Sequence, residues 1–169
     1  SGRWRVAVVA AGGRPADERV ELRRVMGRLR FGELRDGVWM RPDNLSRSPE
    51  LERAADELGR CTWFSADPDL PLERSDGELA ATLWDLDGWA MQADRLRRAM
   101  RPLADELEGG DRAALAPGFV LSAAVLRHFV ADPLLPPELT PRGWPGPALR
   151  REYDRYDELF RDRLREWSG

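Results

Sequence analysis

Residues 31–41, FGELRDGVWMR, decide the fold of the first half of this chain. Phe31–Arg35 and Val38–Arg41 each have the length and composition of a short strand, and Asp36-Gly37 separates them. A two-residue Asp-Gly loop is typical of a tight hairpin, because glycine adopts the positive φ that such a turn needs. The stretch therefore predicts two neighbouring antiparallel strands.

A strand and a helix are predicted before this hairpin. Trp4–Ala10 is an apolar run typical of a central strand, and Gly12-Gly13-Arg14-Pro15 turns the chain after it. Four apolar residues then recur at the spacing i, i+3, i+4, i+7, namely Leu22, Val25, Met26 and Leu29. That spacing places them on one face of a helix that begins near Ala16.

A second helix and a fourth strand are predicted after the hairpin. Ser48 suits the N-cap of a helix over Pro49–Leu58, and Gly59 ends that helix before the strand Cys61–Phe64. The resulting order is β-α-β-β-α-β, which is the ferredoxin-like pattern.

The rest of the chain is predicted to be mostly helical. Asp67–Asp76 has the composition of a linker, and Glu78–Trp84 is expected to add an edge strand. One helix then carries a heptad seam at alternating spacings of three and four: Leu86, Trp89, Ala93, Leu96, Met100, Leu103 and Leu107. Pro102 lies inside this helix and is expected to kink or restart it.

Two more helices complete the expected bundle. Phe119–Val130 is apolar on almost every side, which predicts the buried central helix, and a last helix begins near Pro147. The fold class is therefore α+β, with a ferredoxin-like βαββαβ domain over residues 1–77 and a small helical bundle over residues 78–169.

Composition limits the function classes. All 27 basic residues are arginine, and there is no lysine, which indicates the codon usage of a GC-rich genome. The net charge is −3, so the high arginine content is not evidence for nucleic-acid binding. We expect a cytoplasmic protein, because the start lacks the apolar core of a signal peptide and no apolar run approaches the length of a membrane span. The single cysteine, Cys61, excludes an internal disulfide.

No catalytic site is predicted, and no cofactor or metal is expected. A two-metal nuclease needs clustered carboxylates, but the first strand ends Val9-Ala10-Ala11-Gly12-Gly13 without an acidic residue. The only histidine, His128, lies six residues from Ser122 and almost opposite it on a helix. We therefore interpret His128 as a bundle residue, or alternatively as a residue that orients a ligand, and Cys61 as a buried thiol.

An ordered set of short motifs resembles the PaaX-type transcriptional repressors of phenylacetate catabolism. The motifs are Arg3-Trp4-Arg5-Val6, Arg23–Leu29, Phe31-Gly32-Glu33-Leu34, Gly37-Val38-Trp39-Met40-Arg41-Pro42, Trp84-Asp85-Leu86 and Trp144-Pro145-Gly146. The resemblance implies a middle ferredoxin-like domain and a carboxy-terminal helical domain for dimerisation and effector response. It also implies an aryl-acyl-CoA effector and an amino-terminal winged helix that binds DNA. Nothing before Trp4 resembles that winged helix, so these 169 residues are not expected to bind DNA themselves.

The resemblance leads to specific expectations for partners and ligand. The chain is expected to be part of a homodimer, with the seam from Leu86 to Leu107 in its dimerising and sensing half. Arg41 and Arg127 are expected to contact the phosphates of an acyl-CoA, beside Trp39 and His128. The family pattern has paired arginines after the histidine, where this chain has Val130-Ala131, so a different effector is an alternative. Two further alternatives are a protein-interaction module without a ligand and a degenerate nuclease-like enzyme.

Overall fold

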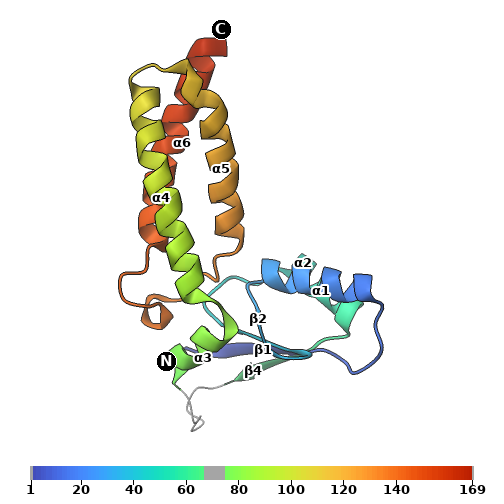
Figure 1. The fold of residues 1–169 in the computed structure, drawn as a ribbon. Coiled ribbons are helices and arrows are strands. Elements are labelled where there is room, and N and C mark those ends of the chain that lie inside the picture. The colour runs from blue at the N-terminus through green and yellow to red at the C-terminus, as the bar shows by residue number, and fades with distance from the viewer. Residues whose placement is uncertain (1, 67–74, 169) are drawn as a thin grey trace. The chain divides into compact units, whose positions relative to one another are not determined.

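The computed structural model describes residues 2–66 and 75–168, and its contacts divide the chain into two units (Figure 1). The sheet unit contains residues 1–85 and 133–140, and the helical unit contains residues 86–132 and 141–169. We predict a domain boundary at residue 77 from the sequence. The contacts also group residues 78–85 and 133–140 with the sheet unit. Each unit is described by itself below.

Residues 4–66 of the sheet unit have the predicted β-α-β-β-α-β order. The strands of the unit are β1 (Trp4–Val8), β2 (Gly32–Arg35), β3 (Val38–Pro42) and β4 (Thr62–Ala66), and its helices are α1 (Ala16–Arg28), α2 (Pro49–Gly59), α3 (Asp76–Leu83) and the short η2 (Pro137–Leu139). The strands pair antiparallel in the order β2-β3-β1-β4. This order inserts β3 between β1 and β2, which confirms the ferredoxin-like fold and the α+β class.

The helices α1 and α2 lie on one face of this sheet (Figure 1). Alternate residues of β1 and β3 face them, because side chains of a strand point to opposite faces in turn. Ala7 and Trp39 therefore pack in one core with Leu22, Val25 and Met26 of α1. At Gly37, φ is +74°, which is the backbone conformation that the hairpin turn required.

The expected edge strand over Glu78–Trp84 is wrong, because this segment forms helix α3. Ser75 caps the helix through a reciprocal pair of bonds, in which the Ser75 hydroxyl accepts the Glu78 amide at 3.3 Å and the Glu78 carboxylate accepts the Ser75 amide at 2.8 Å. Such a capping box fixes the first turn of a helix. Gly32 lets α3 approach β2, since a Cβ atom there would lie 2.7 Å from the Leu83 Cβ. The predicted linker lies largely outside the described residues.

The helical unit contains α4 (Leu86–Glu108), η1 (Arg112–Ala114), α5 (Leu115–Val130) and α6 (Gly146–Ser168). Six of the seven seam residues of α4 are buried, and Leu103 is partly buried; all except Leu86 belong to this unit's own core. The seam is thus occupied by α5 and α6 and is not a free dimerisation surface. The helix continues through Pro102 without a restart; Arg98 and Pro102 are both exposed.

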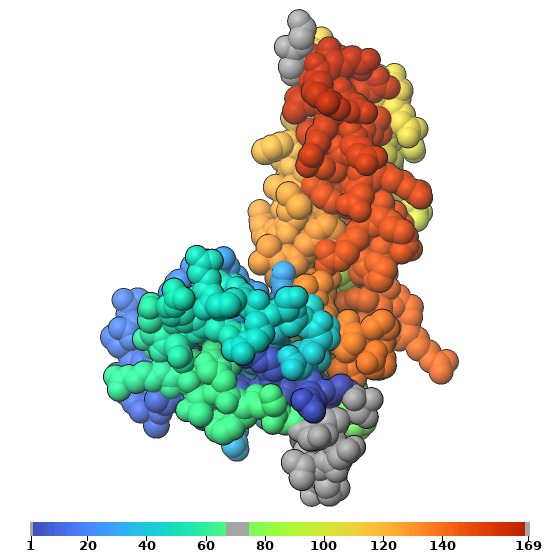
Figure 2. Space-filling model, turned by 180° about the vertical axis from the view of Figure 1, so that it is seen from behind, coloured from blue at the N-terminus to red at the C-terminus, as the bar shows by residue number. Residues whose placement is uncertain are grey.

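The prediction that Phe119–Val130 is the buried central helix is wrong. In α5, only Gly118, Leu121 and Val125 are buried, whereas four large apolar side chains are exposed: Phe119, Val120, Leu126 and Val130. Figure 2 shows α5 and α6 side by side at the surface of this unit. Their close approach depends on Gly118, where a Cβ atom would lie 2.5 Å from the Tyr156 hydroxyl oxygen. The helices α4 and α6 cover only one side of α5, so the apolar side chains on its other side stay exposed.

Candidate functional site

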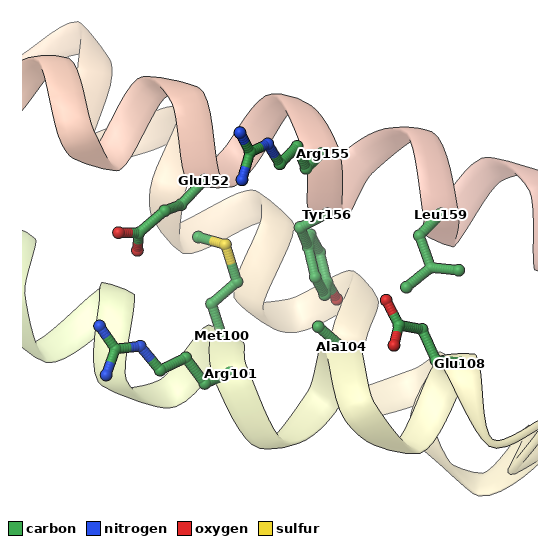
Figure 3. Close-up of a pocket in the computed structure, with 8 residues that line it drawn as sticks. All are labelled: Met100, Arg101, Ala104, Glu108, Glu152, Arg155, Tyr156 and Leu159. Carbon is green, nitrogen blue, oxygen red and sulfur yellow. The ribbon is translucent and has the colours of Figure 1, made fainter.

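A groove of about 370 Å³ runs between α4 and α6 in the helical unit (Figure 3). Its lining comes from both helices: Met100, Arg101, Ala104, Glu108, Glu152, Arg155, Tyr156 and Leu159. The residues recur at spacings of three and four along each helix, so each set lies on one helix face. The volume lies in the range of small-molecule sites.

The floor of the groove is apolar, and its ends carry charge. Met100, Ala104 and Leu159 lie between the two helices, with Arg101 and Glu152 at one end and Glu108 at the other (Figure 3). An apolar floor beside a small number of charged groups suits an amphipathic ligand, because the floor excludes water while the charges orient the polar end.

The carboxylate of Glu152 is held by an arginine that does not line the groove. The Arg97 guanidinium donates to both Glu152 oxygens, at 2.6 and 3.0 Å, and also to Asp94 at 3.1 Å. These bonds from Arg97 are the largest cause of the lowered pKa of Glu152, and the nearby charge of Arg101 lowers it further. With Glu152 paired in this way, the exposed cations Arg101 and Arg155 are the groups at this end that can meet an anion.

A stack of three rings lies elsewhere in the helical unit. The Trp89 ring lies between His128 at a centroid distance of 4.3 Å and Trp144 at 4.6 Å. His128 Nε2 donates to the Trp89 carbonyl oxygen at 3.1 Å, and Trp89 Nε1 donates to the His128 carbonyl oxygen at 3.3 Å. Burial lowers the pKa of His128, which favours the neutral ring. The contacts support the interpretation of His128 as a bundle residue.

A cluster of buried charges lies in the sheet unit. Arg5 and Arg41 are opposite one another on β1 and β3, both are buried, and one buried carboxylate, Glu52, serves the cluster. Glu52 accepts from Arg5 at 2.6 Å and from Arg47 at 2.7 Å. Its own burial raises the pKa of Glu52, but the bonds from Arg47 and Arg5 outweigh this and leave it lowered.

Arg41 is the least satisfied member of this cluster. Its Nε atom has no hydrogen-bond partner among the described residues, and its guanidinium lies 5.5 Å from the centre of the Phe31 ring. Burial is the main cause of the lowered pKa of Arg41, followed by the charge of Arg5. Arg41 therefore carries a charge that the sheet unit tolerates but compensates poorly.

The four ligand residues expected from the sequence lie in different places. Trp39 and Arg41 are buried in the sheet unit, whereas Arg127 is exposed on α5 and His128 lies in the ring stack of the helical unit. Neither unit by itself brings all four together, so a shared ligand site remains a prediction. The sequence reasoning missed Arg101 and Arg155, whose only signal was a polar position beside the apolar stripe of an amphipathic helix.

The described residues offer few side chains that could act as a nucleophile or bind a metal ion. The Cys61 thiol is half-buried and donates to the Ala55 carbonyl at 3.4 Å, and burial raises its pKa to about 11, so it stays protonated at neutral pH. Within residues 2–66 and 75–168, no group of three His, Cys, Asp or Glu side chains is placed to hold a metal ion. The groove between α4 and α6 is therefore a candidate binding site, and the described residues of its lining include no cysteine, serine or histidine.

A ferredoxin-like domain followed by a unit of three long helices is an architecture that few protein families share. Comparison with known families shows which family this is. Residues 1–76 match the PaaX protein central Cas2-like domain, and residues 84–168 match the PaaX-like protein C-terminal domain. Together these matches cover almost the whole chain, and the chain belongs to the PaaX family.

One solved structure is similar to this chain and belongs to a longer chain. It is described as the uncharacterized protein Rv0674 from Mycobacterium tuberculosis, with 37% sequence identity and a TM-score of 0.73. The match covers 96% of this chain but 62% of that chain, so these residues correspond to less than two thirds of it. No curated protein matches this sequence significantly.

Proposed function

We propose that this chain is the effector-sensing and dimerising portion of a PaaX-type transcriptional repressor in the cytoplasm, and that the effector is an aryl-acyl-CoA. The observation that carries the proposal is the groove between α4 and α6, which combines an apolar floor with two exposed arginines. DNA binding in such a protein belongs to a winged helix outside these 169 residues. Membership of the PaaX family supports the regulatory role.

The groove suits the two chemically different ends of an acyl-CoA. A volume of about 370 Å³ accommodates an aryl-acyl group but not a whole coenzyme A thioester, so the nucleotide end remains outside. Arg101 and Arg155 then contact the phosphates, because a guanidinium presents paired donors to phosphate oxygens. Met100, Ala104 and Leu159 contact the aryl ring.

Binding at this position would act on the spacing of two helices. A ligand that contacts α4 and α6 together binds most tightly to one separation of these helices, and it shifts the population toward that conformation. Since the α4 seam forms the core of the helical unit, a change in this spacing alters the packing of the whole unit. This provides a route from effector to repressor state.

Calorimetric titration with phenylacetyl-CoA tests the proposal. Arg101→Ala and Arg155→Ala are each expected to weaken binding about tenfold, the effect of losing one charge-assisted contact. Arg98→Ala removes an exposed arginine of α4 outside the groove and is the matched control. Absence of heat and of a thermal shift at millimolar ligand would contradict effector binding. A loss confined to Arg127→Ala would instead support the ligand residues expected from the sequence.

We also infer that the Cas2-like domain has no nuclease activity. The strand β1 ends at Val8, and Val9, Ala10 and Ala11 follow it where a carboxylate would be needed to bind a metal. Incubation with single- and double-stranded RNA and DNA in the presence of Mg²⁺ or Mn²⁺ tests this inference. Cleavage that chelation abolishes would overturn it and favour the nuclease-like alternative.

A further inference from the structure

The outer face of α5 is an apolar surface that the helical unit does not cover. Phe119 and Val120 are each 68% exposed, Leu126 is 51% exposed and Val130 is 60% exposed. Ala116 and Ala123 are exposed between them, and Arg127 is the one charged residue of the face. A patch of this kind on a folded unit marks an interaction surface.

The positions of this face are symmetric about Ala123. Its exposed residues are 116, 119, 120, 123, 126, 127 and 130, which lie three, four and seven residues on either side of the centre. A helix that presents this spacing can pack against a second helix along a continuous stripe. Because the stripe has the same spacing in both directions, an antiparallel copy of it fits in register.

The side chains also match under this symmetry. In an antiparallel pair centred on Ala123, each Val120 meets Leu126 of the other copy, and the small Ala123 meets itself at the crossing. Each Phe119 meets Arg127 of the other copy, which pairs a guanidinium with an aromatic ring. A parallel pair would instead place Arg127 against Arg127, so the charge of the face selects the antiparallel arrangement.

We propose that two copies of this chain dimerise through α5, packed antiparallel about a twofold axis at Ala123. The proposal rests on the dimeric state included in the proposed function, and it assigns the interface to α5 because the α4 seam is already buried. An isologous contact of this kind is self-complementary and closes at two copies. A single helix pair is a small interface, so a concentration-dependent dimer is expected.

A lipid bilayer is the competing occupant of such a face. By length and composition alone, Arg112–Val130 is apolar enough to span a membrane, which corrects the expectation that no run of this kind is present. However, α5 packs into the helical unit through Leu121 and Val125. The face also carries the exposed Arg127, and a charged side chain is costly in the hydrocarbon core of a bilayer.

Sedimentation velocity across a concentration series tests the interface. Wild type is expected to shift from monomer to dimer, and Ala123→Glu is expected to remain monomeric, because the twofold axis brings its two new charges together. Ala99→Glu makes the same change at an exposed position of α4 and is the matched control, which should dimerise like wild type. Ala123→Lys alone should also be monomeric.

Mixing the two charged variants gives the most specific result. Equal amounts of Ala123→Glu and Ala123→Lys should restore dimers, because position 123 of one copy then faces the opposite charge at position 123 of the other copy. Dimers that Ala123→Glu leaves intact, or a mixture that stays monomeric, would overturn the proposal. A monomeric wild type that binds anionic vesicles would overturn it in favour of a membrane surface. Titration of the groove with phenylacetyl-CoA is independent of these outcomes, so the proposed interface can fail while effector binding holds.

Discussion

The sheet unit and the helical unit depart from ordinary packing in opposite directions. The sheet unit buries three charged side chains, Arg5, Arg41 and Glu52, which are 7%, 3% and 8% exposed. The helical unit leaves the large apolar side chains of α5 in solvent, with Phe119 and Val120 each 68% exposed. Burial in this protein therefore follows the partners that a position finds in the fold, and residue type alone does not decide it.

This difference has a separate physical reason in each unit. In the sheet unit, β1 and β3 direct alternate side chains toward α2, and Glu52 on α2 meets Arg5 there. In the helical unit, α5 contacts α4 and α6 through the side that carries Leu121 and Val125, and no third neighbour covers its other side among the described residues of that unit. The sheet unit thus pairs its buried charges internally, and the helical unit leaves one apolar side of α5 exposed, although it also buries one charge, Asp132.

Loss of the carboxylate that serves the buried cluster should have the largest effect. Glu52→Gln leaves Arg5 and Arg41 buried without a counter-charge, and we expect it to lower the free energy of unfolding by about 3–5 kcal/mol. Urea denaturation followed by circular dichroism measures this loss. Glu21→Gln breaks the exposed pair with Arg24 and is the control, which should leave the midpoint unchanged. If both variants lowered the free energy of unfolding equally, the buried charges would contribute no more to stability than an exposed ion pair.

The inner face of α5 should tolerate less change than a solvent-exposed helix position. Gly118→Ala places a Cβ atom against the Tyr156 hydroxyl and the Phe160 ring, and it should destabilise the chain by about 1–3 kcal/mol. Gly27→Ala on α1 is the matched control, since a Cβ atom there meets no described atom within 4 Å. That variant should stabilise the chain by up to about 1 kcal/mol, because alanine favours a helix more than glycine does. Differential scanning calorimetry of both variants tests the contrast, and a stabilising Gly118→Ala would refute it.

Removal of the poorly compensated arginine should have a smaller effect than removal of the carboxylate. Arg41→Met retains an apolar stem beside Phe31 and removes a desolvated charge, so we expect the free energy of unfolding to stay within about 1 kcal/mol of wild type. The same urea titration measures it beside Glu52→Gln. If Arg41→Met lowered the free energy of unfolding as much as Glu52→Gln, Arg41 would have a stabilising partner. The interpretation of Arg41 as a poorly compensated charge would then be wrong.

The smallest expected effect concerns the ring stack and is a dependence on pH. Burial lowers the pKa of His128 below 6.5 in the folded chain, so the unfolded chain takes up this proton first as the pH falls. The stabilisation is therefore complete above pH 6.5 and is lost as the pH falls from there through the lowered pKa. The melting temperature between pH 7.5 and pH 5.5 reports this loss, and His128→Gln should remove it.

Two features make that window specific to His128. The chain has one histidine, and the carboxylates with a lowered pKa, Glu21, Glu52 and Glu152, titrate below pH 4.5 in the folded chain. Their contribution is present above pH 4.5 and is lost only as the pH falls further through their lowered pKa values. A wild-type melting temperature that is constant from pH 7.5 to pH 5.5 would exclude a role for the neutral His128 ring.

Much of the fold could be predicted from local patterns. The Asp36-Gly37 turn, the helix that begins after Ser48 and the seam of α4 all depend on residues close in sequence, and all are present in the structure, although the Ser48 side chain makes no capping hydrogen bond. The segment after Ser75 was predicted wrongly because apolar content suggested a strand, although Ser75 and Glu78 form a helix-capping pair. A capping pair at that spacing was visible in the sequence and would have corrected the prediction.

The sequence by itself determined the βαββαβ order of the sheet elements, the α+β class and, through its ordered motifs, the family to which the chain belongs. The order and the class follow from periodicity and turn residues, which act over a few neighbouring positions. Only the tertiary structure decided that α5 buries one side and exposes the other, because its composition is apolar on almost every side and contains no signal for the number of neighbours. Likewise, only the packing of α4 against α6 brings Arg101 and Arg155 to one groove, since the two residues are distant in sequence and meet through contacts that no local pattern encodes.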